Sequence, residues 1–208
     1  NEVRTQTVAW FILCGVVSFV MGNTPVGAVF APIAASALLY AGYETFQQRY
    51  DSRAASNILI AVAWGASIGG MVTPLGGGQA VVTLGFLEKY IGHEVYFIDW
   101  SLRMLPISIL VMAVMSLFMY FVMKPEVATF KGSKDFYQKE LEEMGSMKFE
   151  EKVIFYAFVL IVLLALFRPM YVPFVKGPYF KWLHPSPLFF ILAAVLFFIP
   201  SKSNKGEN

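Results

Sequence analysis

The chain has 208 residues, of which 57% are hydrophobic and 14% are charged, and its formal net charge is +2. So many apolar residues with so few charges exceed what the core of a soluble domain holds, and they predict an all-α polytopic membrane protein. The small net charge argues against nucleic acid as a partner, and the single cysteine excludes a disulfide framework. The first residue is Asn1 rather than Met, which suggests a portion of a longer protein.

The first predicted element consists of two short apolar runs, residues 8–21 and 26–40, separated by a Gly-Asn-Thr-Pro sequence that begins at Gly22. We expect a re-entrant helical hairpin over residues 5–41, which enters and leaves the membrane on one side. Pro25 suits the first position of the second helix, where its missing N–H is not needed. A simple kink in an ordinary helix and two full crossings are the alternatives.

The second predicted element is a broken transmembrane helix over residues 56–92, with apolar runs at 58–71 and 80–91. Three glycines, Gly76 to Gly78, lie in the break, either as a plain bend or because a ligand approaches the backbone there. Unpaired backbone groups are costly at membrane depth, so broken helices persist where they line a cavity or are buried in protein. Pairs of interrupted apolar segments are typical of transporter binding sites.

The remaining chain predicts a transmembrane helix over residues 101–123, a polar linker over 124–148, and two further helices over 151–171 and 186–200. The linker pattern fits an amphipathic helix on the membrane surface and equally fits a solvated connection. We assign residues 1–123 to one domain and 149–208 to the start of another. The four tryptophans lie near predicted segment ends, as interface anchors do.

Lysine and arginine placement predicts the topology. With a re-entrant hairpin and a single crossing by the broken helix, eleven of the sixteen basic residues fall on one side of the membrane and five on the other. The positive-inside rule places the richer side in the cytoplasm. Loops 42–55 and 124–150 are therefore predicted to be cytoplasmic.

The predicted membrane segments contain little ionisable chemistry. No acidic residue occurs from Thr5 to Tyr43 or from Arg53 to Leu87, so a proton relay is not visible. The breaks offer the side chains of Asn23 and Thr24, freed carbonyls and new helix N-termini. Carbonyl and amide oxygens suit a hard cation such as sodium, whereas helix N-termini suit an anion. No catalytic set can be assembled, so we expect neither an enzyme nor an organic cofactor.

Several motifs together resemble the divalent anion/sodium symporter family. Gly22-Asn23-Thr24 followed by Ala31-Pro32-Ile33-Ala34 resembles the family's Ser-Asn-Thr hairpin tip and the helix after it. Residues 67–76, Ser-Ile-Gly-Gly-Met-Val-Thr-Pro-Leu-Gly, resemble the family's break. Residues 139–145, 149–152 and Arg168-Pro169 resemble its cytoplasmic linker and next helix. The resemblance covers nearly the whole chain in order.

The resemblance implies an elevator-type, inverted-repeat transporter, of which this chain holds one incomplete repeat, assembled as a homodimer in the cell membrane. It implies that Asn23 and Thr24 contact the substrate. Pro25, Gly77 and Gly78 are further candidate substrate contacts, not from the resemblance but because they lie where a new helix begins and where glycine lets the backbone approach a ligand. The resemblance also implies that a sodium ion is held by Gly22, Asn23, Ser67, Gly69, Gly70, Thr73 and Gly76. Gly65 and Gly69 have a small-xxx-small spacing that also fits helix packing.

Two departures from the family pattern stand at the site. Gly22 replaces the usual Ser and removes a hydroxyl, while its carbonyl remains. Gly77-Gly78-Gln79-Ala80 replaces the family's Thr-Pro-Pro-Asn. From the resemblance we expect transport of a dicarboxylate, citrate or sulfate coupled to sodium. Sodium-independent anion exchange and a non-transporting receptor or scaffold are the alternatives.

Overall fold

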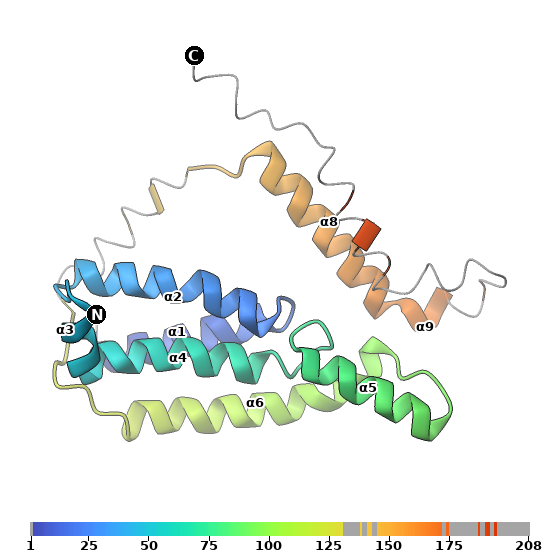
Figure 1. Cartoon of the computed structure of the whole chain (residues 1–208), viewed down its shortest axis with the longest axis horizontal. Helices are drawn as coiled ribbons and strands as arrows, with labels where there is room; N and C mark the ends of the chain where they lie inside the picture. Colours follow the sequence, from blue (N-terminus) through green and yellow to red (C-terminus); the bar gives the residue numbers. More distant parts are fainter. Residues whose placement is uncertain are drawn as a thin grey trace, which may run out of the picture. The chain divides into compact units, whose positions relative to one another are not determined.

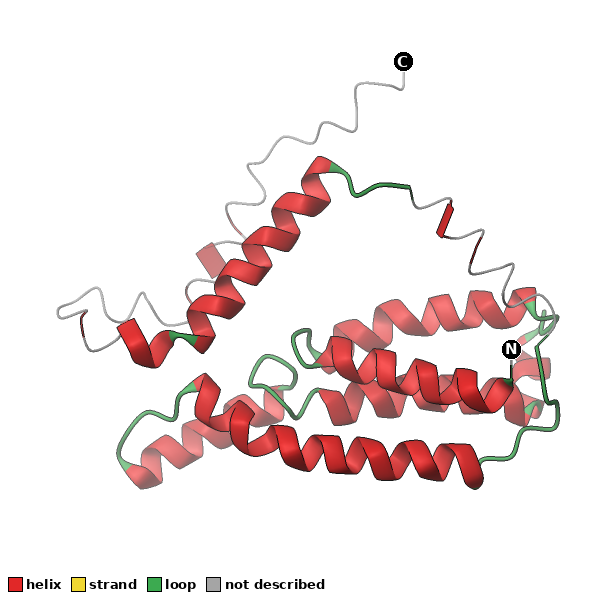
Figure 2. Cartoon of the chain, turned by 180° about the vertical axis from the view of Figure 1, so that it is seen from behind, coloured by secondary structure: helices red, strands yellow, loops and turns green. Residues whose placement is uncertain are grey.

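The structure is a computed structural model that describes residues 2–130 and 145–171, together with positions 138, 141, 142, 174, 187, 190, 191 and 194. Every regular element in these residues is a helix, as Figure 2 shows. The chain divides into two compact units, Asn1–Val95 with Asp99–Met144 and Tyr96–Ile98 with Gly145–Asn208.

The chain opens with a helical hairpin made of α1 (Val3–Ser18) and α2 (Asn23–Tyr40). Residues 19–24 form the hairpin tip. The two helices touch through Trp10 and Phe30, whose rings meet edge to face with centroids 6.3 Å apart. Trp10 is only 7% exposed in the middle of α1, so its prediction as an interface anchor is wrong, because the ring fills the space between the helices.

The predicted break separates α4 (Arg53–Gly69) from α5 (Gly78–Ile91). A short helix, α3 (Phe46–Asp51), precedes α4 and is held by a capping box between Thr45 and Gln48. The side chain of Ser52 then caps α4 by accepting the N–H of Ala55. Residues 70–77 lie between the two helices and are called the break below.

The hairpin packs on α4 through glycine, and α1 and α4 form the most extensive helix pair of the first unit (Figure 1). A Cβ on Gly65 would overlap the carbonyl oxygen of Phe11, and a Cβ on Gly69 would overlap that of Gly15. Only glycine allows backbones to approach so closely, and this matches the small-xxx-small spacing read from the sequence.

Helix α6 (Phe97–Phe121) runs past α1 and α4 and faces them with methionines. The buried members are Met112 and Met119, and Met115 and Met123 pack against the same core. The spacing of Met112, Met115 and Met119 follows one face of α6, and Met123 lies just after the helix ends. Unbranched thioether side chains fill irregular gaps, and they occupy the space between α6 and the pair α1 and α4, which is wider than the glycine contact within that pair.

Residues 122–130 close the end of the first unit where α1 and α4 begin. The N–H of Val3 donates to the carbonyl of Ala128 at 2.9 Å. The amide of Asn57 donates to the carbonyl of Met123 at 3.3 Å. Glu126 accepts the hydroxyl of Ser52 and, at 2.8 Å, the N–H of Ala54. Glu126 thus caps α4 from 72 residues downstream.

The second unit contains α8 (Phe149–Leu166) and α9 (Arg168–Tyr171). The helix predicted over 151–171 is therefore interrupted at Phe167. Pro169 explains the interruption, because proline has no N–H to donate and its ring displaces the preceding turn. The hydroxyl of Tyr171 donates to the carbonyl of Leu164 at 3.1 Å. Residues 131–137, 139, 140, 143 and 144 of the predicted linker, and all but four positions of the helix predicted over 186–200, lie outside the described residues.

The helix lengths bear on membrane crossing. Among the described residues, α2 and α6 are the helices long and apolar enough to cross a bilayer. With 25 residues, α6 measures about 38 Å. The outward face of α6 carries exposed apolar side chains such as Leu102, Leu110 and Leu117, as a lipid-facing surface does. Because α2 also meets the length criterion, re-entry of the hairpin stays a prediction.

The predicted element boundaries shift by a few residues. The helix predicted over 101–123 begins four residues earlier and ends two earlier. The first run begins five residues before position 8, and α4 begins five residues before position 58. In α1 and α4 the added first turn contains polar residues, which hydropathy alone does not include.

Candidate functional site

The hairpin tip and the break meet through backbone and hydroxyl hydrogen bonds. The N–H of Asn23 donates to the carbonyl of Gly76 at 2.8 Å. The hydroxyl of Thr73 donates to the carbonyl of Phe19, and the hydroxyl of Ser18 donates to that of Ala66 at 2.7 Å. Segments about 50 residues apart in the chain are therefore joined in one junction.

Four helix ends meet at this junction. Helices α1 and α4 arrive with their C-terminal ends, and α2 and α5 leave with their N-terminal ends (Figure 1). Helix C-termini carry partial negative charge, whereas N-termini carry partial positive charge and free N–H groups. The junction therefore offers a cation and an anion separate places a short distance apart.

Two glycines allow the backbone to fold this tightly at the break. A Cβ on Gly70 would lie 2.6 Å from the carbonyl oxygen of Gly76. A Cβ on Gly76 would lie 2.5 Å from the carbonyl oxygen of Gly70 and 2.7 Å from that of Ser18. Carbonyl oxygens from the end of α1 and from the break thus crowd around the two glycines, and sodium prefers such oxygen ligands.

The described residues contain no group of three acidic, histidine or cysteine side chains placed to hold a metal ion. Oxygen ligands for a cation at the junction are therefore backbone carbonyls and neutral side chains. The residues fit a sodium ion in this respect, because a single positive charge does not require carboxylate ligands when several dipoles converge.

The residues predicted to hold sodium have different surroundings. Thr73 is 7% exposed, and its hydroxyl also accepts the N–H of Gly76 at 3.3 Å, so it braces the junction. The hydroxyl of Ser67 is exposed and donates back to the carbonyl of Ala63 at 2.8 Å. Gly69 packs on Gly15, as described above. The structure therefore gathers Asn23, Gly70, Thr73 and Gly76 most closely.

At the tip, Gly22 and Asn23 prepare the start of α2. The carbonyl of Gly22 accepts the N–H of Val26 at 3.1 Å, which forms the first turn. The side-chain oxygen of Asn23 accepts the N–H of Thr24 at 2.8 Å and its hydroxyl at 3.3 Å. The prediction that Pro25 is the first helical residue is wrong by two positions, because the helix begins at Asn23. Pro25 still lies in the first turn, where no N–H is needed.

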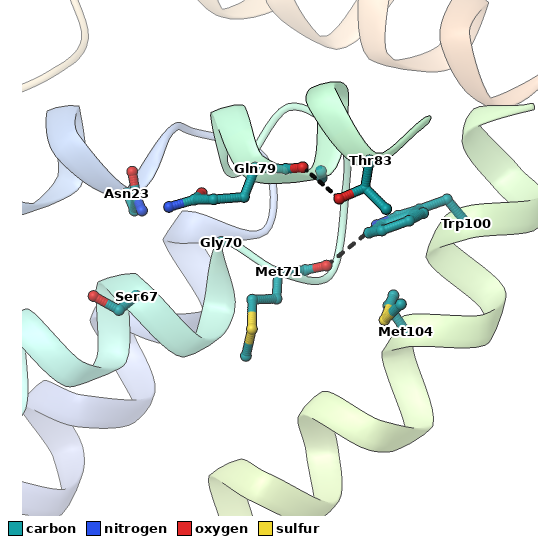
Figure 3. Close-up of a pocket in the computed structure, with 9 residues that line it drawn as sticks. Asn23, Ser67, Gly70, Met71, Gln79, Thr83, Trp100 and Met104 are labelled. Carbon is teal, nitrogen blue, oxygen red and sulfur yellow. Dashed lines mark hydrogen bonds between the residues drawn. The ribbon is translucent and has the colours of Figure 1, made fainter. Parts of the chain in front are cut away.

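A cleft of about 480 Å³ opens beside the junction (Figure 3). The tip, the break, α5 and α6 all contribute to its lining, which consists of Asn23, Ser67, Gly70, Met71, Gln79, Ala80, Thr83, Trp100 and Met104. None of these side chains is charged. The indole N–H of Trp100 donates to the carbonyl of Met71 at 3.3 Å and ties α6 to the break.

The structure also brings together cleft residues that the sequence did not single out. Met71, Thr83, Trp100 and Met104 were not predicted as site residues, and Gln79 was noted only as a departure from the family pattern. Hydropathy gave no signal for them, because they lie in or beside apolar runs. Helical spacing could have identified Thr83, because it lies one turn after Gln79 on α5. Its hydroxyl donates to the carbonyl of Gln79 at 2.8 Å.

Comparison with known proteins gives a consistent match. The chain is 23% identical over 213 residues to the sodium-dependent dicarboxylate transporter SdcS of Staphylococcus saprophyticus, covering 99% of this chain and 41% of that protein. It is 23% identical over 204 residues to SdcS of Staphylococcus aureus, covering 94% of this chain and 38% of the relative. The chain thus spans about two fifths of the length of these curated relatives.

The family described as the sodium:sulfate symporter transmembrane region matches residues 3–177. That range contains the hairpin, the break, α6, α8 and α9. The relatives are transporters, and the apolar helices of this chain fit an integral membrane protein. With most of its length matched, the chain belongs to the sodium:sulfate symporter family.

Proposed function

We propose that the longer protein to which this chain belongs is a secondary active transporter that moves a divalent anion across the membrane together with sodium. The observation that carries this proposal is the junction of four helix ends, joined by the bond from Asn23 to Gly76. The relatives named as sodium-dependent dicarboxylate transporters support both the coupling ion and the class of substrate.

In this proposal sodium lies on the carbonyl side of the junction. Gly22, Asn23, Gly70 and Gly76 provide oxygens there, and Thr73 holds the tip and the break at a fixed distance. Ser67 and Gly69 belong to the last turn of α4, whose negative end favours the cation. A sodium ion there would also screen the substrate's negative charge, which makes the binding of the two solutes interdependent.

The anion lies against the positive N-terminal ends of α2 and α5. On α2 it is met by side chains and the helix dipole, because the N–H groups of Asn23 and Thr24 are already bonded within the protein. Asn23, Thr24 and Pro25 form the first turn of α2, and Gly77 and Gly78 form the start of α5. Nothing lies within 4 Å of a Cβ position on Gly78, so this face of α5 is open to a ligand. The substrate is a dicarboxylate, citrate or sulfate.

The larger architecture follows from the same proposal. The hairpin is re-entrant, residues 1–123 belong to a moving transport domain, and residues 149–208 begin a scaffold that dimerises in the cell membrane. Alternating access is achieved by an elevator movement of the transport domain. Two loops, 42–55 and 124–150, face the cytoplasm.

Uptake by the full-length protein in proteoliposomes tests the function. Labelled succinate, citrate and sulfate are supplied with an inward sodium gradient, with an equal potassium gradient, or with unlabelled anion inside. We expect uptake only with sodium. Equal uptake with sodium and with potassium would contradict sodium coupling. Uptake driven by internal anion alone would show that the protein is an anion exchanger.

Asn23→Ala separates a transporter from a receptor or scaffold that kept the fold. The substitution removes the side-chain amide but keeps the backbone N–H that bonds to Gly76. We expect uptake to fall about 10- to 100-fold, because a hydrogen bond to a charged group is lost. The thermal midpoint should change little. Undiminished uptake by a folded variant would remove Asn23 from the site.

A further inference from the structure

Gln79 is the second residue of α5, and its side chain extends along the cleft toward the hairpin tip. Figure 3 shows its amide pointing at the side chain of Asn23 across the opening. Its Oε1 lies 2.9 Å from the position of a Cβ on Gly77, so the chain lies close over the start of the helix. Within residues 2–130, the hydrogen bonds that engage Asn23 and Gln79 use the Asn23 side-chain oxygen and backbone groups. The Gln79 amide is therefore available to a ligand.

The α6 side of the cleft is apolar. Met71, Trp100 and Met104 line it, and the indole N–H of Trp100 is already used by the carbonyl of Met71. This wall covers a ligand but offers it no donor. The cleft therefore has a polar end, with two amides and an open helix N-terminus, and an apolar side.

A ligand with oxygens in every direction suits such a cleft poorly. Sulfate would turn at least one charged oxygen toward the methionines and the indole ring, where that oxygen would lose water without gaining a hydrogen bond. A carboxylate on a carbon chain can place its oxygens at the amides and its methylene groups on the wall. The two-sided lining therefore discriminates between these classes of anion.

We infer that Gln79 is a specificity-determining residue of the substrate site: its amide N–H donates to a carboxylate oxygen beside Asn23, and the wall of Met71, Trp100 and Met104 selects organic carboxylates over sulfate. The inference rests on the proposed function and narrows its substrate class. It assigns to Gln79 a role that arises where this sequence departs from the family's Thr-Pro-Pro-Asn.

The test measures succinate uptake and its competition by sulfate in proteoliposomes with the full-length protein. We expect Gln79→Ala to raise the KM for succinate about tenfold, which corresponds to one lost hydrogen bond to a charged group. The sodium concentration for half-maximal uptake should stay within about twofold when measured at saturating succinate. Gln79→Glu should abolish uptake, because a carboxylate would repel the substrate.

Gln47→Ala is the matched control. It removes the same side chain from α3, where the Gln47 amide bonds to Asp51 at the surface, and it should leave the KM unchanged. Gln79 is exposed, so its variants should fold, and their thermal midpoints check this. An unchanged KM for succinate in both Gln79 variants would overturn the role of Gln79.

Met104→Gln tests the wall separately. A polar group on the apolar side should improve competition by sulfate relative to succinate by about three- to tenfold. Sulfate that competes as well as succinate in the unmodified protein would overturn the inferred selectivity, even with transport intact. Failure to take up any anion would instead overturn the proposed function, and this inference with it.

Discussion

At the scale of single residues, glycine decides how closely the hairpin approaches α4. Gly65 and Gly69 let the backbones of α1 and α4 touch, whereas Gly70 and Gly76 let the break fold on itself. The same residue type therefore serves helix packing at two positions and site geometry at the other two. Spacing in the sequence indicated the role in helix packing. It did not show that Gly69 serves packing whereas its neighbour Gly70 shapes the site.

Gly69→Ala should destabilise the full-length protein by about 1–3 kcal/mol or more, since the added methyl meets the rigid backbone of Gly15. The free energy of unfolding in detergent measures this effect. Gly27→Ala is the control on α2, because nothing lies within 4 Å of a Cβ on Gly27. Equal stability of the two variants would contradict the close packing.

At the scale of elements, α4 is held at its start by Glu126, which lies in the segment that follows α6. Glu126 accepts hydrogen bonds from Ser52 and from the N–H of Ala54. Partial burial raises the pKa of Glu126, but hydrogen bonds from Ser52 and the backbone outweigh this, so the pKa lies below its ordinary value of 4.5. The charged form is therefore the one that the folded end of α4 favours.

Glu126→Gln should lower the thermal midpoint at neutral pH, because the helix start loses its negative partner. The pKa is depressed in the folded state, so the stabilisation is present above about pH 4.5 and is lost as the pH falls through the folded value. The difference between the variant and the unmodified protein should therefore shrink on acidification. Glu142→Gln, at an exposed position, is the control. A difference that is independent of pH would contradict a role for the charge.

The elements themselves were largely predictable, because apolar runs and glycine or proline interruptions mark them. The break at 72–79 and the loop after Met21 were placed within a few residues. Pro169 could have predicted the interruption at Phe167, but the helix was assigned from its continuous apolar run, which extends past that position. The cap from Glu126 was not predictable, because it joins residues 72 apart through a loop without periodicity. The hydrogen bond from Trp100 to Met71 was not predictable either, because hydropathy carries no information about long-range hydrogen bonds.

At the scale of the whole molecule, basic residues predict which loops face the cytoplasm. Gln47 in α3 and His93 between α5 and α6 are both exposed, and they fall on opposite sides in that topology. In a cysteine-free full-length protein, with Cys14 replaced by serine, we expect His93→Cys to react with a membrane-impermeant maleimide added to intact cells. Gln47→Cys should react only after permeabilisation. The reverse pattern would invert the topology, and reaction of both from outside would exclude a single crossing by α4 and α5.

The junction is built without ionisable carboxylates, imidazoles, ammonium or guanidinium groups: from Thr5 to Tyr43 and from Ala54 to Leu87 the chain has no Asp, Glu, His, Lys or Arg. Dipoles and neutral amides do not change their charge between pH 5 and 9. The charge of this part of the site, and with it its affinity for a given ionic species, is therefore constant across that range. A change of pH then acts on the protonation of the ligand. A weak dicarboxylic acid gains a proton as the medium becomes acidic, so its affinity here should follow its own titration curve and reveal which ionic species is bound.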